Sequence, residues 1–383
     1  MPGSIQKRGK NKYLLVVSAG FDITGKRIRH TKVITANSDA EAEKQLALFY
    51  AEVMKGNIRN DQQLTLGEYC KHWIETKEKK LSSKTIDGYK KLLKRINEAL
   101  GHIRLAKLKP RHLVEFYNLL REENLTENTI SHYHRFLHAV LETAYKVDKL
   151  IPENPAKAVI DPPTPGRPRP HFYDDDEQIL KLLKALNNAP IKYKMFVILA
   201  LETGARRGEL LGLEWKDIDF EKGIIYIRRA SNYTKENGIY TSTTKTETSV
   251  RKLSITEELI AFLKEYKKWQ NELRLQKGDK WIDTDRLFTQ DNGMPMHPDT
   301  PDKWFKKFLR ENNLPPITIH GLRHTNASIM IANDVDIITI AERLGHADKS
   351  TPVRIYGHML NKKEKQAAET IANATVRKIK EQQ

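Results

Sequence analysis

Five prolines and one glycine lie within the eleven residues 161–171, and this segment constrains the fold of the chain more than any other. Proline fixes φ and has no backbone N–H, so a helix does not run through such a segment and an extended, semi-rigid spacer is favoured. We therefore interpret 161–171 as an interdomain linker. The 383 residues also exceed what one small core needs, which indicates two or three domains.

Residues 1–60 are predicted to form a small basic domain. Short β-prone runs flank a turn, and Ser38 followed by Glu41 has the pattern of a helix N-cap. We expect a three-stranded β-sheet backed by one helix that ends near Met54. The segment has eleven Lys and Arg against five Asp and Glu, a net charge of 11 − 5 = +6. A sheet face that contacts DNA has this composition, and a solvated basic surface is the alternative.

Residues 64–160 have helical periodicity and four helix start signals, at Thr65, Ser82, Pro110 and Thr126. Four or five helices are expected. Within 129–145 one apolar stripe is predicted to face the core, at Ile130, Tyr133, His134, Leu137, Val140, Leu141 and Ala144. Several basic residues are candidates for gripping a phosphate backbone, although solvated helix faces carry the same types: Lys84, Lys90, Lys91, Lys94, Arg95, Lys107 and Arg111.

The charge of the whole chain points to a polyanionic partner. Its 66 Lys and Arg exceed its 49 Asp and Glu, giving a formal net charge of +17 that attracts nucleic acid. A membrane surface is the weaker alternative, because the basic residues are dispersed and no apolar run has spanning length. The single cysteine and the polar N-terminus predict a cytoplasmic protein. Zinc-ligand spacing, phosphate-binding glycine loops and dinucleotide fingerprints are absent from the sequence, so no metal or cofactor is implied.

Residues 172–383 are predicted to be mainly helical with a small antiparallel sheet. Helices are expected at 177–186, at 192–203 and from Ala205, strands near 223–229, 239–244 and 251–255, and helices thereafter.

Several spaced polar residues in this last region suggest chemistry. Arg206 opens a predicted helix and Glu209 follows one turn later, so the carboxylate can hold the guanidinium. Lys245 falls between two strand-like runs and is predicted to project from a hairpin tip. His320 and Arg323 share one helix face. Each signal alone is typical of an ordinary surface pair or a solvated turn.

His346 and Tyr356 complete the set near the C-terminus. In this order and spacing the motifs resemble those of the tyrosine recombinase, or phage integrase, family, over residues 174 to about 360. The helical segment 64–160 looks like the family's core-DNA-binding domain, and 1–60 is similar to an arm-site-binding domain. The resemblance makes 172–383 the catalytic domain with a C-terminal tail helix.

The resemblance implies a role for each spaced residue. Two arginines would clamp the phosphate (Arg206 and Arg323), a lysine would protonate the leaving oxygen (Lys245), two histidines would assist (His320 and His346), a tyrosine would be the nucleophile (Tyr356), and a carboxylate would support the first arginine (Glu209). A phenol with a pKa of about 10 needs such cationic neighbours to attack at neutral pH.

The implied reaction forms a 3′-phosphotyrosyl bond and frees a 5′-hydroxyl without ATP. The implied assembly is a homotetramer on double-stranded DNA with core and arm attachment sites, in some cases with an accessory DNA-bending or excision factor. Two alternatives keep part of this interpretation. One is a type IB-like topoisomerase or resolvase, and the other is a DNA-binding regulator whose catalytic set is vestigial.

Overall fold

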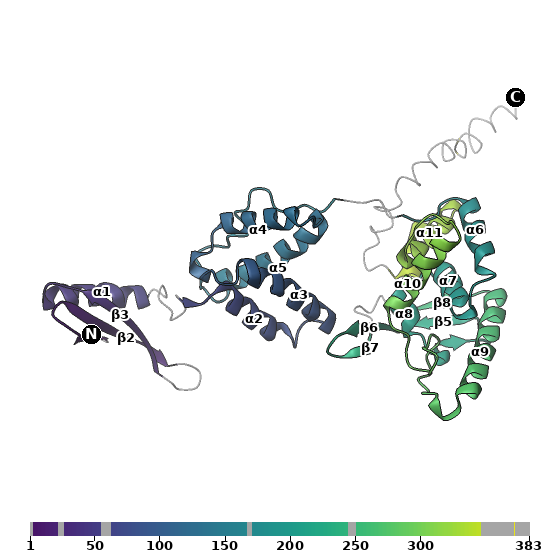
Figure 1. Ribbon diagram of the computed structural model, residues 1–383, viewed down its shortest axis with the longest axis horizontal. Helices are drawn as coiled ribbons and strands as arrows, with labels where there is room; N and C mark the ends of the chain where they lie inside the picture. The colour runs from purple at the N-terminus through teal and green to yellow at the C-terminus, as the bar shows by residue number, and fades with distance from the viewer. Residues whose placement is uncertain are drawn as a thin grey trace. The chain divides into compact units, whose positions relative to one another are not determined.

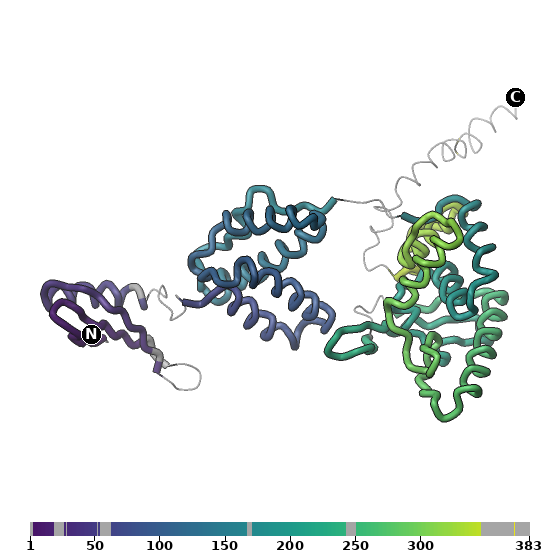
Figure 2. Tube along the Cα trace, viewed as in Figure 1, coloured from purple at the N-terminus to yellow at the C-terminus, as the bar shows by residue number. Residues whose placement is uncertain are grey.

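The computed structural model describes residues 3–21, 27–54, 63–166, 171–243, 250–345 and 371. The chain divides into two compact units, Met1–Arg167 and Pro168–Gln383, and the boundary falls within the proline-rich segment. Figure 2 traces the backbone through these parts. The predicted fold class is confirmed: the described residues are mainly helical, with a small N-terminal sheet and further short antiparallel strands. Among them, every helix is too short or too polar to cross a membrane.

The N-terminal part is an antiparallel sheet in the order β1 (Gly3–Lys7), β2 (Lys12–Phe21) and β3 (Arg27–Thr35), packed against α1 (Asp39–Met54). Alternate residues of β2, Tyr13, Leu15 and Val17, are buried, as the two-residue period of a strand requires. The predicted N-cap is present, since the Glu41 backbone N–H donates to the Ser38 hydroxyl at 3.2 Å.

The second part is a helical body made of α2 (Leu66–Lys77), α3 (Ser83–Ala99), the 3₁₀ turn η2 (Leu105–Lys107), α4 (Pro110–Glu122) and α5 (Glu127–Lys146) (Figure 1). All four predicted start signals stand at helix N-termini. Most of the predicted α5 stripe is buried, but Tyr133 and His134 are only partly buried. Phe136, which the stripe omitted, is 2% exposed and packs against Trp73.

The C-terminal unit contains the remaining elements. They are α6 (Asp176–Leu186), α7 (Ile191–Thr203), α8 (Arg207–Gly212), η3 (Trp215–Asp217), β4 (Ile218–Asp219), β5 (Ile224–Ile227), β6 (Arg229–Thr234), β7 (Gly238–Thr243), β8 (Arg251–Ser254), α9 (Glu257–Lys277), η5 (Gly278–Lys280), α10 (Asp299–Glu311), α11 (Ile319–Ala332) and α12 (Ile337–Leu344). Helix α7 has a continuous apolar run from Met195 to Leu201 and packs in the core, in contact with α8, α9, α10 and α11.

The strands of this unit correct one expectation. Strand β7 pairs with β6, whereas β8 pairs with β5 in a separate sheet of order β4-β5-β8. The two strands that flank Lys245 are therefore not hairpin partners of each other, contrary to what the sequence suggests, and Lys245 itself lies outside the described residues. The hairpin that does form closes between Thr234 and Gly238. Strand β6 was missed because its sequence lacks apolar alternation.

Candidate active site

The junction between α7 and α8 is the base of the site. Helix α7 ends at Gly204, which has a φ of 58° and reverses the chain so that Arg206 becomes the N-cap of α8. A Cβ atom at Gly204 would lie 2.5 Å from the Leu344 side chain and 2.6 Å from Asn326. Glycine is therefore required by both the backbone conformation and the close approach of α11 and α12.

Arg206 is fixed as the sequence predicts, and also by a contact that the sequence does not show. Its Nη1 donates to Glu209 Oε1 at 2.8 Å, and the Glu209 carboxylate in turn accepts the Arg206 backbone N–H at 2.9 Å. Its Nη2 donates to the carbonyl oxygen of Gly345, 139 residues away in the sequence, at 2.9 Å. The Arg206 side chain is still 41% exposed, so its guanidinium is fixed by these hydrogen bonds and remains accessible from solvent.

Glu209 is a buried anion shared by two cations. Burial alone would raise the pKa of its carboxyl, but hydrogen bonds and charge attraction from Arg251 and Arg206 outweigh burial and lower the pKa below its ordinary value. Arg251, from β8, donates to Glu209 Oε2 at 2.9 Å. Sequence reasoning missed Arg251; the available signal was its place on the same strand face as the buried Leu253.

Arg323 reaches the same junction from α11. It is 3% exposed, and its Nη1 donates to the carbonyl oxygen of Gly204 at 2.7 Å across 119 residues of sequence. Asn326, one turn later, donates to the carbonyl oxygen of Leu201 at 2.6 Å. These bonds tie α11 to the end of α7. The two predicted arginines are thereby both anchored around the Gly204 turn.

His320 and His324 lie one turn apart on α11, with ring centroids 4.8 Å apart in an edge-to-face arrangement. Burial, followed by the charges of Arg323 and Arg206, lowers the pKa of His320, although the residue keeps an exposed face. Burial, together with His320 and Arg323, lowers the pKa of His324 to about 4. Both imidazoles are therefore neutral at pH 7, able to accept a proton or a hydrogen bond. The sequence offered the i, i+4 spacing of the pair, but His324 was not assigned a role.

A pocket of about 1080 Å³ opens over these residues. Arg206, His320 and His324 line it, with Arg207 and Lys306 as further cations. Asp302 also lines the pocket and pairs with Arg207, so Arg206 and Lys306 supply the positive charge that suits an anion. No group of three His, Cys, Asp or Glu able to hold a metal ion occurs among the described residues.

The C-terminal end of α12 leads to the rest of the predicted set. Gly345 ends this helix with a φ of 67°, and its carbonyl oxygen accepts from Arg206. His346 follows directly in the sequence. His346, Lys245 and Tyr356 themselves lie outside the described residues, as does the predicted tail helix except for residue 371. The structure thus brings together Arg206, Glu209, His320 and Arg323.

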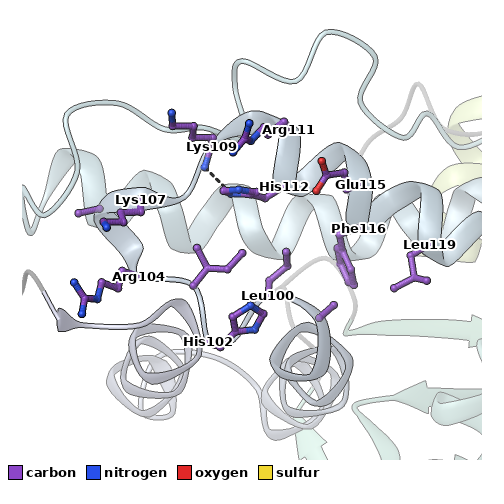
Figure 3. A pocket seen from close by; sticks show the side chains of 13 residues that line it. Leu100, His102, Arg104, Lys107, Lys109, Arg111, His112, Glu115, Phe116 and Leu119 are labelled. Carbon is purple, nitrogen blue, oxygen red and sulfur yellow. Dashed lines mark hydrogen bonds between the residues drawn. The ribbon is translucent and has the colours of Figure 1, made fainter.

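The helical body holds a second, basic concavity (Figure 3). This groove of about 1020 Å³ runs between η2 and the start of α4 over an apolar floor that includes Leu100 and Phe116. Four cations line it: Arg104, Lys107, Lys109 and Arg111. Within the described part of the chain none of the four forms an ion pair, whereas three other predicted phosphate-gripping residues are paired with carboxylates: Lys90, Lys91 and Arg95.

Comparisons with known proteins place this geometry in context. The sequence model of the phage integrase family matches residues 174–363, and that of the phage integrase N-terminal SAM-like domain matches residues 65–121. The chain is 30% identical over 387 residues to a protein named tyrosine recombinase XerC-like from Caldanaerobacter subterraneus subsp. tengcongensis, covering 95% of this chain and 97% of that one. It is 28% identical over 372 residues to the ICEBs1 integrase of Bacillus subtilis, covering 96% and 99%.

Two solved structures share the fold. The Tn1549 transposon integrase in complex with transposon right end DNA superposes with a TM-score of 0.67 at 22% identity, covering 82% of this chain and 100% of that one. A lambda integrase dimer bound to a COC′ core site superposes with a TM-score of 0.57 at 17% identity, covering 92% and 93%.

Proposed function

Because the chain belongs to the phage integrase family of tyrosine recombinases, we propose that it integrates and excises its mobile element through a 3′-phosphotyrosyl intermediate at Tyr356. The family consists of enzymes that cleave and rejoin DNA in site-specific recombination, and this chain is one of them. The observation that carries the residue-level proposal is the convergence of Arg206 and Arg323 on the Gly204 turn.

The two guanidiniums clamp the phosphate that is attacked. A guanidinium stays charged when desolvated and offers forked N–H donors to the non-bridging oxygens of a phosphodiester. Arg206 is preorganised by Glu209 and Gly345, so little reorganisation is needed as negative charge grows in the transition state. His320 is neutral at pH 7 and takes the proton of the tyrosine as it attacks.

The remaining roles rest on the family motif. Tyr356 attacks phosphorus, Lys245 donates a proton to the departing 5′ oxygen, and His346 donates a hydrogen bond to a phosphate oxygen. The direction of the chain at Gly345 supports the last assignment, because the Gly345 carbonyl is already held by Arg206 and His346 is the next residue. The 5′-hydroxyl of another strand then displaces the tyrosine, so the energy of the phosphodiester is retained.

We assign residues 1–60 to arm-site binding, 64–160 to core-site binding, 161–171 to the linker and 172–383 to catalysis. Pairwise exchange of strands between two sites needs four active subunits, hence a homotetramer on DNA, with an accessory DNA-bending or excision factor setting direction. The enzyme acts in the cytoplasm on the element's DNA. The formal charge of +17 supports binding to an extended polyanion.

A nicked duplex that traps the covalent intermediate tests the chemistry. Wild-type protein is expected to form a covalent adduct with core-site DNA, and Tyr356→Phe to bind the same DNA without forming it. Binding without any wild-type adduct would instead mark a DNA-binding regulator, and an adduct that survives Tyr356→Phe would assign the nucleophile elsewhere. Relaxation of supercoiled plasmid without strand exchange would favour the topoisomerase alternative. Deletion of residues 1–60 is expected to spare core-site cleavage and impair arm-dependent integration.

The basic groove of Figure 3 supplies a test of the core-binding assignment. Replacing Arg104, Lys107 and Arg111 by glutamine removes three cations of the groove that make no ion pair with any described residue. If each contacts a phosphate, the slope of log K against log salt falls by about 0.9 per contact, or about 2.7 in total. The control replaces Lys146 and Lys157, which both pair with Glu142, and is expected to leave the slope nearly unchanged. An unchanged slope in the triple variant would remove the groove from the DNA interface.

A further inference from the structure

Arg251 connects three elements of the catalytic unit. It belongs to β8, and its side chain is only 7% exposed. Its Nη2 donates to Glu209 Oε2, in α8, at 2.9 Å, and its Nε donates to the carbonyl oxygen of Arg343, in α12, at 2.8 Å. These two donors point to two acceptors that are more than 130 residues apart, since 343 − 209 = 134.

Gly345 makes the third contact of Arg251. A Cβ atom at Gly345 would lie 2.8 Å from Arg251 Nη1 and 3.1 Å from Cζ, so the backbone of this glycine rests against the guanidinium. The carbonyl oxygen of Gly345 meanwhile accepts from Arg206 at 2.9 Å. The turn at the end of α12 is thus held between two arginines that share the Glu209 carboxylate.

We propose that Arg251 is a positioning residue of the recombinase site, holding Glu209 and the C-terminal turn of α12 in one fixed arrangement. The inference rests on the proposed function. Glu209 and the Gly345 carbonyl both hold the Arg206 guanidinium, so one buried arginine supports both anchors of a phosphate-binding residue. We expect Arg251 to do this without touching the DNA, because its side chain is only 7% exposed and its Nη2 and Nε donate to Glu209 and to the Arg343 carbonyl.

Arginine is needed here for its geometry as well as its charge. Its planar fork reaches two acceptors in different directions, whereas the compact ammonium of lysine reaches one of them. Arg251→Lys therefore keeps the positive charge beside Glu209 and loses the bridge to α12. Arg251→Gln loses both. The order of activity expected from a positioning role is wild type, then lysine, then glutamine.

Single-turnover cleavage of the nicked core-site duplex separates positioning from folding. The burst amplitude reports the fraction of folded, active enzyme, and the rate constant reports the geometry of that fraction. The rate constant is expected to fall at least tenfold in Arg251→Gln and by less in Arg251→Lys, while DNA affinity changes by less than about twofold. The matched control is Lys252→Gln, the next residue on β8 and exposed, which is expected to cleave as wild type does.

The pH profile is a second readout that a purely structural role would not move. Glu209 faces Arg206 at the start of its own helix and Arg251 from β8, with Arg343 of α12 next to Arg251. Removing Arg251 removes an attraction that favours the ionised carboxylate, so Glu209 protonates at higher pH and releases Arg206 there. The acidic limb of the cleavage rate is expected to move to higher pH in Arg251→Gln and to stay in place in Arg251→Lys.

The outcomes are distinct. A wild-type rate constant and a wild-type acidic limb in Arg251→Gln would overturn the inference. Loss of burst amplitude with an unchanged rate constant in both variants would also overturn it, because Arg251 would then serve stability alone. If Arg251→Gln does not fold, the lysine variant decides through its rate constant, which must be lower than that of wild type. Absence of an adduct with wild-type protein would refute the proposed function itself.

Discussion

Replacing His324 by glutamine is expected to make the catalytic unit less sensitive to acid. The His324 side chain is buried, and its pKa in the folded protein is about 4, against about 6.5 for an unperturbed imidazole. Between these two values the unfolded chain takes up a proton that the folded chain does not. Stability therefore falls as the pH drops from about 7 to about 4.

The size of this effect follows from the gap between the two pKa values. A gap of about 2.5, at about 1.4 kcal/mol for each pKa unit, gives about 3 kcal/mol of stability lost by pH 4. Glutamine keeps a polar side chain of similar reach and does not titrate. The difference in unfolding free energy between wild type and His324→Gln is thus expected to change by about 3 kcal/mol over this range, since the other titrating groups are common to both proteins.

Urea unfolding followed by tryptophan fluorescence measures this difference. Four of the five tryptophans lie in the catalytic unit, at 215, 269, 281 and 304, so the signal reports mainly on that unit. Unfolding free energies are compared at several pH values from 7 to 4. A difference that stays constant within about 0.5 kcal/mol would show that His324 titrates normally, and the proposed desolvation of the imidazole would be wrong.

Three further substitutions have defined outcomes. Gly204→Ala places a Cβ in a left-handed, crowded backbone position and is expected to lower the free energy of unfolding by at least about 2 kcal/mol, measured by thermal unfolding. The control Gly166→Ala adds a Cβ in open space and is expected to leave the stability unchanged. Glu209→Gln leaves the buried Arg251 guanidinium, and the solvent-facing guanidinium of Arg206, without their anion. It is expected to cost about 3 kcal/mol and to abolish adduct formation, whereas Glu127→Gln in an exposed pair is expected to cost under about 1 kcal/mol. Ser38→Ala removes the N-cap of α1. The first turn of this helix is expected to open more easily by about 1 kcal/mol, which faster hydrogen exchange of its backbone amides would measure.

Local signals in the sequence predicted local structure well. Of the four start signals in the helical body, Pro110 has the fixed φ of a first helical residue. The other three, Thr65, Ser82 and Thr126, became N-caps because each hydroxyl accepts the backbone N–H of the residue three positions on. The same holds for the Arg206 and Glu209 pair, whose i, i+3 spacing alone brings the two side chains together. In both cases the partners are neighbours on one helix, so their spacing fixes their geometry.

Contacts between distant segments were not predictable in this way. Nothing in the spacing of Arg251 and Glu209, 42 residues apart, indicates that they pair, because the pairing depends on β8 joining β5 and not β7. Strand register is set by the packing of the whole sheet. The expected hairpin between β7 and β8 has the same cause, because adjacency in the sequence does not show that β7 pairs with β6 and β8 with β5. The burial of Phe136 likewise depends on aromatic neighbours from α2 and α3.

The anchors of the site arginines explain how a cationic pocket survives in a folded protein. Arg323 donates to the carbonyl of Gly204 and Arg206 to that of Gly345, and Arg251 donates to the carbonyl of Arg343. These carbonyls lie at the C-terminal ends of α7 and α12, where the helix dipole is negative and unpaired oxygens accept hydrogen bonds. A carbonyl holds a guanidinium without cancelling its charge. Among the described ion pairs, the single Glu209 carboxylate serves both Arg206 and Arg251, so these arginines outnumber the anion that they share and can attract an incoming phosphate. A separate carboxylate for each arginine would have cancelled that attraction.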